Sequence, residues 1–121
     1  MNKKNIIGKT GEDIACEYLI KKGWAILQRN WKRRGDEVDI ILKTGDETLI
    51  FCEVKTMFIG NLTPEDNLTS AKLRKFIRVA EFFTRQYPEL IHQDRGWRMD
   101  LLAIDLSVNG KAMDIRHYEN I

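Results

Sequence analysis

Apolar and polar residues alternate most clearly in residues 37–55, which predict two strands joined by a tight turn. Apolar, β-branched and aromatic side chains recur at every second position on both sides of a segment that contains Gly and Asp. Such period-two runs, bounded by turn residues, are typical of a β-hairpin. Charged side chains interrupt the pattern at Asp39, Glu53 and Lys55, so these three positions are the first candidates for chemistry.

The register of this hairpin decides whether its two acidic residues meet. A pairing with an odd number of loop residues, with Gly45 at a positive φ, places Asp39 opposite Glu53. A slip of one residue would place Asp39 opposite Cys52 and would separate the carboxylates. Glu53 and Lys55 are two positions apart on one strand, so both side chains leave the sheet on the same face.

Two carboxylates at facing strand positions need a positive partner. At a separation of about 4 Å they repel by roughly 4 kcal/mol at an effective dielectric constant near 20. Either a cation lies between them or one of them is protonated. Lys55 supplies one positive charge, and a divalent cation would supply the rest. Because carboxylate oxygens suit hard cations, the pattern predicts a Mg²⁺ or Mn²⁺ site at Asp39 and Glu53.

The remaining patterns predict two amphipathic helices and three further strands. The first helix is expected to begin with Thr10 as its N-cap and to end at Gly23. The predicted helices span residues 8–23 and 70–87, and the further strands span residues 24–31, 97–106 and 112–117. The order α-β-β-β-α-β-β predicts an α/β fold, a mixed β-sheet flanked by helices, in a single domain over residues 1–121.

Basic residues gather beside the predicted metal site and on the second helix. Such runs are typical of solvated faces, but next to a metal site they favour contacts with phosphate. The candidate nucleic-acid-binding residues are Arg29, Lys32, Arg33, Arg34, Lys72 and Lys75. Glu12 stands in the first turn of the first predicted helix. It either complements the helix dipole or adds a carboxylate to the metal site.

Composition narrows the class of protein without identifying a ligand. The net charge of +2 over 121 residues is too small to indicate nucleic-acid binding by itself. There is no apolar run of the roughly 20 residues that span a bilayer, and no signal peptide, so we expect a cytoplasmic protein without a membrane partner. Cys16 and Cys52 fall within apolar patterns and are expected to be reduced thiols in the core.

The motifs together resemble those of a known family. They are Gly8-x-x-Gly11-Glu12-x-x-Ala15, Asn30-Trp31-Lys32, Glu37-Val38-Asp39-Ile40-Ile41, Phe51-x-Glu53-Val54-Lys55-Thr56, Lys72 and Arg98-x-Asp100. A helix with Glu, a strand with Asp and a strand with Glu-x-Lys resemble the restriction-endonuclease-like PD-(D/E)xK superfamily. The closer resemblance, over nearly the whole chain, is to the UPF0102 (YraN-like) family. One departure is Asp36, which stands where that family usually has glycine.

The resemblance implies a nuclease-type site on a restriction-endonuclease-like sheet. Asp39, Glu53 and the Val54 carbonyl would hold Mg²⁺. Lys55 would orient the attacking water, and Glu12 would complete the acidic cluster, as in archaeal Holliday-junction resolvases. The implied function is a metal-dependent endonuclease that hydrolyses phosphodiester bonds of branched or damaged DNA, with a homodimer expected where two strands are cut.

Other interpretations stay open at this point. The same fold would serve a non-catalytic module that binds nucleic acid or a protein partner. A further alternative is an enzyme that acts on RNA or on a nucleotide. Asp39 and Glu53 would otherwise belong to a structural ion-pair network with Lys55, which contributes little when exposed, about 0–1 kcal/mol per pair.

Overall fold

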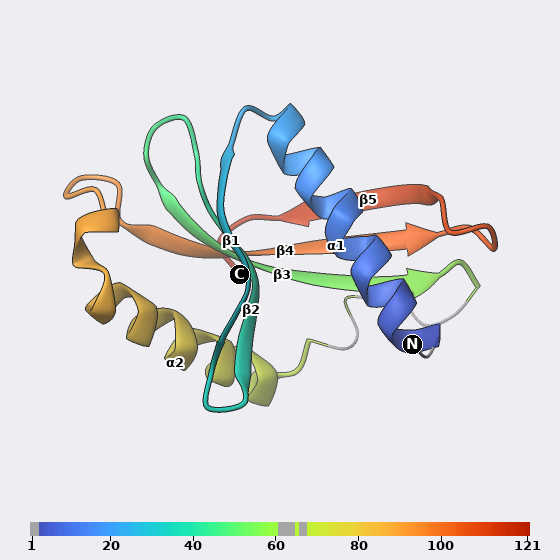
Figure 1. The fold of residues 1–121 in the computed structure, drawn as a ribbon, viewed down its shortest axis with the longest axis horizontal. Helices are drawn as coiled ribbons and strands as arrows, with labels where there is room; N and C mark the ends of the chain where they lie inside the picture. The colour runs from blue at the N-terminus through green and yellow to red at the C-terminus, as the bar shows by residue number, and fades with distance from the viewer. Residues whose placement is uncertain (1–2, 61–64, 66–67) are drawn as a thin grey trace.

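A five-stranded mixed sheet with one long helix on each face forms the protein (Figure 1). The computed structural model describes residues 3–60, 65 and 68–121, with side chains from residue 8 onward. The elements in chain order are α1 (Lys3–Lys21), β1 (Ala25–Arg33), β2 (Asp36–Lys43), β3 (Leu49–Phe58), α2 (Ser70–Gln86), the 3-10 helix η2 (Pro88–Leu90), β4 (Trp97–Leu106) and β5 (Ala112–Tyr118). The predicted α/β fold and its order α-β-β-β-α-β-β are confirmed.

The strands lie in the sheet in their chain order, from β1 at one edge to β5 at the other. All neighbouring strands are antiparallel except β3 and β4, which are parallel. Parallel neighbours need a long crossover connection, and α2 lies within the one that joins β3 to β4. Within the described residues, no helix combines the length and apolarity needed to cross a bilayer.

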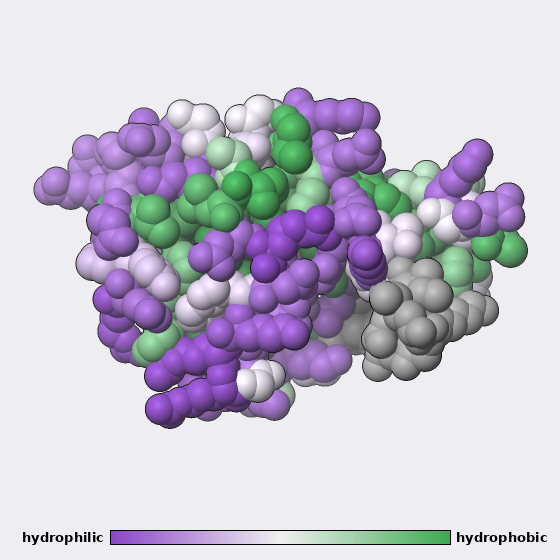
Figure 2. Space-filling model, viewed as in Figure 1, coloured by the Kyte–Doolittle hydropathy of each residue, from purple (hydrophilic) through white to green (hydrophobic). Residues whose placement is uncertain are grey.

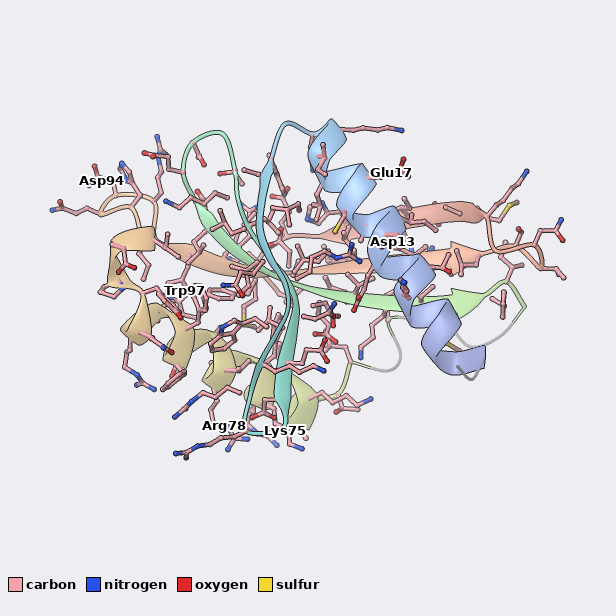
Figure 3. The ribbon with its side chains drawn as sticks, viewed as in Figure 1. Asp13, Glu17, Lys75, Arg78, Asp94 and Trp97 are labelled. Carbon is pink, nitrogen blue, oxygen red and sulfur yellow. The ribbon has the colours of Figure 1, made fainter. Side chains whose placement is uncertain are left out.

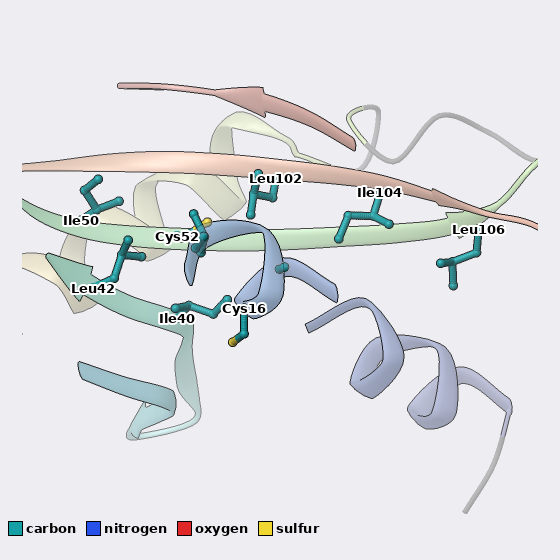
Figure 4. Close-up of a cluster of buried hydrophobic side chains, with 10 residues drawn as sticks. Cys16, Ile40, Leu42, Ile50, Cys52, Leu102, Ile104 and Leu106 are labelled. Atoms are coloured by element: carbon teal, nitrogen blue, oxygen red, sulfur yellow. The ribbon is translucent and has the colours of Figure 1, made fainter. Parts of the chain in front are cut away.

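Alternating side chains of the central strands supply two separate cores. Figure 4 shows the core on the α1 side, where Cys16 of α1 meets residues of β2, β3 and β4. The core on the α2 side contains Phe51 of β3 and Phe83 of α2, which contact each other edge to face. Cys16 and Cys52 are both buried and unbridged, as predicted. The central strands are therefore buried on both faces, and a charged side chain on them is conspicuous.

The predicted register of the β2–β3 hairpin is confirmed. Ile40 pairs with Cys52 and Leu42 with Ile50, so continuing the same register past Ile40 would bring Asp39 level with Glu53. The turn chemistry differs from the prediction, because Glu47 has the positive φ (70°). The Asp46 carboxylate accepts hydrogen bonds from Thr44 and Thr48, and these bonds shape the five residues between the strands.

The prediction for the first helix was wrong at its start and correct at its end. Helix α1 begins at Lys3, so Thr10 lies inside it and is not its N-cap. The N-cap preference of threonine suggested a start at Thr10, but such local preferences are weak and tertiary contacts override them. Gly23 ends this part of the chain with φ +86°, which glycine adopts without strain.

Gly11 is the point where α1 comes closest to β3. A Cβ atom there would overlap Thr56 Oγ1 and lie 2.9 Å from Thr56 Cβ. This close approach brings the next residue, Glu12, down onto the sheet. Gly8 lies one turn away on the same helix, and a Cβ there would meet nothing within 4 Å.

The second helix matches its prediction closely. It spans Ser70–Gln86, and the Thr69 side chain caps it by accepting a hydrogen bond from the Lys72 N–H at 3.2 Å. Its apolar face is buried on the sheet through Phe76, Val79, Ala80 and Phe83. The opposite face, which carries most of its cations, is left to solvent.

A buried carboxylate ties β4 to β5 and to the C-terminal segment. Asp100 accepts hydrogen bonds from Arg98 (3.0 Å), His117 (2.8 Å) and the Asn120 N–H (3.0 Å). Burial alone would raise the pKa of Asp100, but these donors outweigh it and hold the pKa below its usual value. The Arg98-x-Asp100 motif therefore has a structural role.

We predict that Gly11→Ala destabilises the protein by about 1–3 kcal/mol, because α1 must move away from Thr56. The matched substitution Gly8→Ala should stabilise it by about 0.5–1 kcal/mol, since alanine favours a helix and has free space there. Urea unfolding of both variants measures the two effects. Equal stabilities for the two variants would contradict the close packing of α1 on β3.

Candidate functional site

The regular alternation of β2 breaks at Asp39. Val38 packs in the core on the α2 side, whereas Ile40, two positions on, packs on the α1 side. Across from this break, Asn30 of β1 has a left-handed backbone with φ 54°. The backbone pairing of β2 with β3 ends at Ile40, and beyond it the Asp39 side chain accepts the Val54 N–H at 2.8 Å. Where β2 and β3 part, a side-chain hydrogen bond to the Asp39 carboxylate thus takes the place of the backbone hydrogen bonds between the strands.

Three further carboxylates surround Asp39. Oxygens of Glu12, Glu37 and Asp39 all lie within 4.8 Å of one another. Glu12 and Glu53 are both close enough to share a hydrogen bond with the Asp39 carboxyl. The structure therefore brings together the predicted residues Glu12, Asp39 and Glu53, and places the Val54 peptide beside them.

The electrostatics of this acidic cluster oppose ionisation. Burial, together with the charge of Glu53, raises the pKa of Asp39 to about 8, although the Val54 N–H works against the rise. Burial also raises the pKa of Glu53, against the effect of Lys55, and that of Glu12, against the hydrogen bond from Asn30. Without a cation, the cluster at neutral pH holds at least one proton that a metal ion would displace.

Two members of this site, Asn30 and Glu37, were missed as site residues in the sequence analysis. The Asn30 amide donates to both oxygens of Glu12 (3.0 and 3.1 Å) and to Glu37 Oε1 (2.6 Å). A signal for Asn30 existed, because asparagine in mid-strand tolerates the left-handed backbone found here. For Glu37 the signal was its position two residues before Asp39, on the same strand.

Lys55 lies at the border between the acidic cluster and a groove of mixed charge, which Asp36 also lines. Its Nζ is 3.2 Å from Glu53 Oε1, and both side chains are largely covered. The groove is lined by Glu37, Glu53 and Lys55 from the sheet and by Lys72 and Lys75 from α2. The prediction that Glu53 and Lys55 share one face of β3 agrees with this placement.

The other predicted nucleic-acid-binding residues separate into different places. Arg33 and Arg34 line a second groove against α2. Arg29 is instead engaged within the chain, 2.8 Å from Asp13 and 3.8 Å from Glu12. Lys32 is exposed on β1 and lines neither groove. Lys72, Lys75, Arg33 and Arg34 are thus the predicted cations that lie where a ligand on the α2 side would meet them.

Comparison with known proteins places the chain in a family. Residues 11–104 match the model of the uncharacterised protein family UPF0102. The chain belongs to the UPF0102 family. UPF0102 proteins of Caldicellulosiruptor saccharolyticus and Dictyoglomus thermophilum are 36% and 38% identical to it, each covering 99% of this chain and 98% of the relative. A UPF0102 protein of Flavobacterium johnsoniae is 32% identical over 97% of this chain and 94% of its own.

The donor atoms of the acidic cluster fit a hard divalent cation. The metal-ligand cluster found within the described residues consists of carboxylates alone, with no histidine or cysteine. Oxygen donors of this kind suit Mg²⁺ or Mn²⁺ rather than zinc. The raised pKa of Asp39 is the second sign of fit, because burial first and the charge of Glu53 second make its ionised form unfavourable, and a bound cation would offset both. The names of the UPF0102 relatives state no activity, so the reaction has to be inferred from this site.

We predict that Asp39→Asn stabilises the metal-free protein above neutral pH. The pKa of Asp39 is raised on folding to about 8 from an unfolded value near 4. Between these values the unfolded chain releases the proton and the folded chain keeps it, so Asp39 lowers the stability as the pH rises through this interval. In EDTA, the variant should melt higher than the wild type by about 5 °C at pH 8, and the gap should close towards pH 5.

Glu17→Gln is the control for this comparison, since Glu17 is exposed on α1 and lies outside the cluster. Its melting temperature should follow that of the wild type at every pH. A variant Asp39→Asn that melts lower than the wild type at pH 8 would mean that the carboxylate serves the fold rather than a ligand.

Proposed function

We propose that the protein is a metal-dependent endonuclease that hydrolyses phosphodiester bonds of DNA. The observation that carries the proposal is the partly buried group of Asp39, Glu53 and Glu12 next to Lys55, at the edge of a groove to which α2 adds two further lysines. Clustered acids of raised pKa with a positive partner are typical of functional sites. The motif Asp39, Glu53-x-Lys55 also resembles that of the PD-(D/E)xK nucleases.

The chain's own residues divide into ligands and groups that act on the substrate. Asp39, Glu53 and the Val54 carbonyl would hold the cation, with Glu12 and Glu37 completing the negative shell. Lys55 would orient the attacking water and balance the charge that builds up on the phosphate. A bound Mg²⁺ or Mn²⁺ would supply Lewis-acid activation of the scissile phosphodiester and of the water.

DNA is the substrate that the surroundings of the site favour. Lys72 and Lys75 face the acidic cluster across the groove, so a phosphate entering it would meet cations on both walls. The described residues include no evident base-reading element, and recognition by shape, as in branched or damaged DNA, would need none. With this proposal we keep the expectation of a cytoplasmic protein. Cuts in two strands of the DNA would need two copies of the chain.

A non-catalytic module that binds nucleic acid is the second candidate. Asn30 satisfies Glu12 and Glu37 by hydrogen bonds, and Lys55 pairs with Glu53, so part of the acidic charge is balanced within the chain. Such a module would bind DNA with strong salt dependence and yield no products with any divalent cation.

We predict that the wild type nicks branched or plasmid DNA in Mg²⁺ or Mn²⁺. Asp39→Asn and Lys55→Ala should each lower the cleavage rate by about 100-fold or more, because each removes a charge that the reaction needs in a shielded site. Product formation followed on gels, with equal protein concentrations, measures the effect.

Lys43→Ala is the matched lysine control, since Lys43 lies at the opposite end of β2 from the cluster. It should cleave at the wild-type rate. Cleavage that survives both site substitutions would refute the proposed site, and DNA binding without cleavage by the wild type would favour the non-catalytic module.

A further inference from the structure

Four arginines from two distant parts of the chain line one groove. Arg33 and Arg34 come from the end of β1 and its turn, and Arg78 and Arg85 come from α2. Figure 3 shows Arg78 and Lys75 side by side at the edge where α2 meets the β1–β2 turn, and Figure 2 shows this edge as hydrophilic. Arg78 and Arg85 are seven residues apart, two helical turns, and so lie on one face of α2.

One carboxylate, Asp36, lines this arginine groove together with the four arginines, but it forms no ion pair with them. Among the residues that the structure describes, no carboxylate lies within ion-pair distance of any of its four guanidinium groups. Burial and the neighbouring Arg34 and Arg85 charges lower the pKa of Arg33, which shows how closely these groups are crowded. Like charges held together in this way are unfavourable unless an anion is bound between them.

Arg33 is held in place by an aromatic ring instead of an acid. Its guanidinium carbon lies 3.1 Å from the centre of the Phe82 ring, and Phe82 in turn stacks on Trp31. Stacking on a ring face orients a guanidinium group while its N–H edge stays available for hydrogen bonds. This arrangement suits a planar, bidentate contact with phosphate.

Arg34 occupies a backbone position that disfavours it. The β1–β2 turn consists of Arg34 and Gly35, with φ values of 49° and 84°. A two-residue turn with both φ values positive strongly favours Asn-Gly, because asparagine tolerates the left-handed region better than arginine. An arginine that has this unfavourable φ and lines a groove with three other arginines favours a role for its charge over a role in the turn.

The arginine groove adjoins the groove of the acidic cluster. Asp36 and Val79 line both of them. Along α2, Lys72 and Lys75 face the first groove, and Arg78 and Arg85 face the second. From Lys72 to Arg85 the helix rises about 20 Å, which equals about six nucleotide steps of a duplex strand.

We propose that the arginine groove binds backbone phosphates of the nucleic-acid strand whose scissile phosphate lies at the acidic cluster. The inference rests on the proposed function and adds the path of the substrate, away from the cluster along α2. Phosphates repeat along a strand at a spacing that lets one ligand fill both grooves, and guanidinium forks match them. An acidic peptide would bind the arginine groove but would not explain the adjoining groove, where lysines lie beside the acidic cluster.

The test measures binding without turnover. A fluorescent duplex of about 20 base pairs, longer than the basic face of α2, is titrated with protein in Ca²⁺ over a series of salt concentrations. Arg78→Ala/Arg85→Ala should weaken binding about 10- to 100-fold at 0.1 M salt and reduce the steepness of the log–log salt dependence by about 2. Lys9→Ala/Lys111→Ala, on the α1 side of the sheet, is the matched control and should bind as the wild type does.

Arg34→Asn separates binding from folding. Asparagine fits the turn better, so this variant should melt at or above the wild-type temperature while binding DNA more weakly. Unchanged affinity and salt dependence in both arginine variants would overturn the proposed path, even if the protein cleaves DNA. Salt-dependent binding of poly-aspartate, with no binding of DNA, would overturn it in favour of an acidic protein partner. If the wild type does not cleave DNA but the arginine substitutions weaken DNA binding as expected, the result would refute only the nuclease activity.

Discussion

Buried negative charge at the point where β2 and β3 part is the constraint on which the rest of the site depends. The Val54 N–H holds Asp39 in place, and the close approach of α1 at Gly11 adds Glu12 to the same spot. Burial and the charge of Glu53 then raise the pKa of Asp39. A fold that assembles four carboxylates in this way gains little stability from them, and a bound divalent cation is the partner that would make the arrangement favourable.

The two faces of the sheet have different tasks around this point. The α1 side supplies Glu12 and a deep apolar core. Arg29 of β1 is engaged by two acidic residues of α1, Glu12 and Asp13. The α2 side carries a row of cations along its grooves, first as lysines beside Glu53 and then as arginines beside the β1–β2 turn. We infer that a polyanion approaches along α2 and reaches the acidic cluster from that side.

Local patterns predicted the parts of this arrangement that depend on neighbouring residues. The period-two alternation was enough for the two strands and for the shared face of Glu53 and Lys55, because strand geometry dictates that face. Of the two registers considered, the structure has the one in which Ile40 pairs with Cys52. The start of α1 and the arginine groove were not predictable in the same way, because each depends on contacts between separate elements. Asn30 and Glu37 left signals within their own strands, but only the folded sheet shows that both meet Glu12.

A calorimetric titration of Mn²⁺ into the wild type and into Asp39→Asn tests the central claim most directly. The account predicts saturable binding of one equivalent by the wild type near pH 8, with release of protons from the acidic cluster, and no detectable binding by the variant. Binding of equal strength in both proteins, or no binding by the wild type even with duplex DNA present, would contradict a metal site at Asp39.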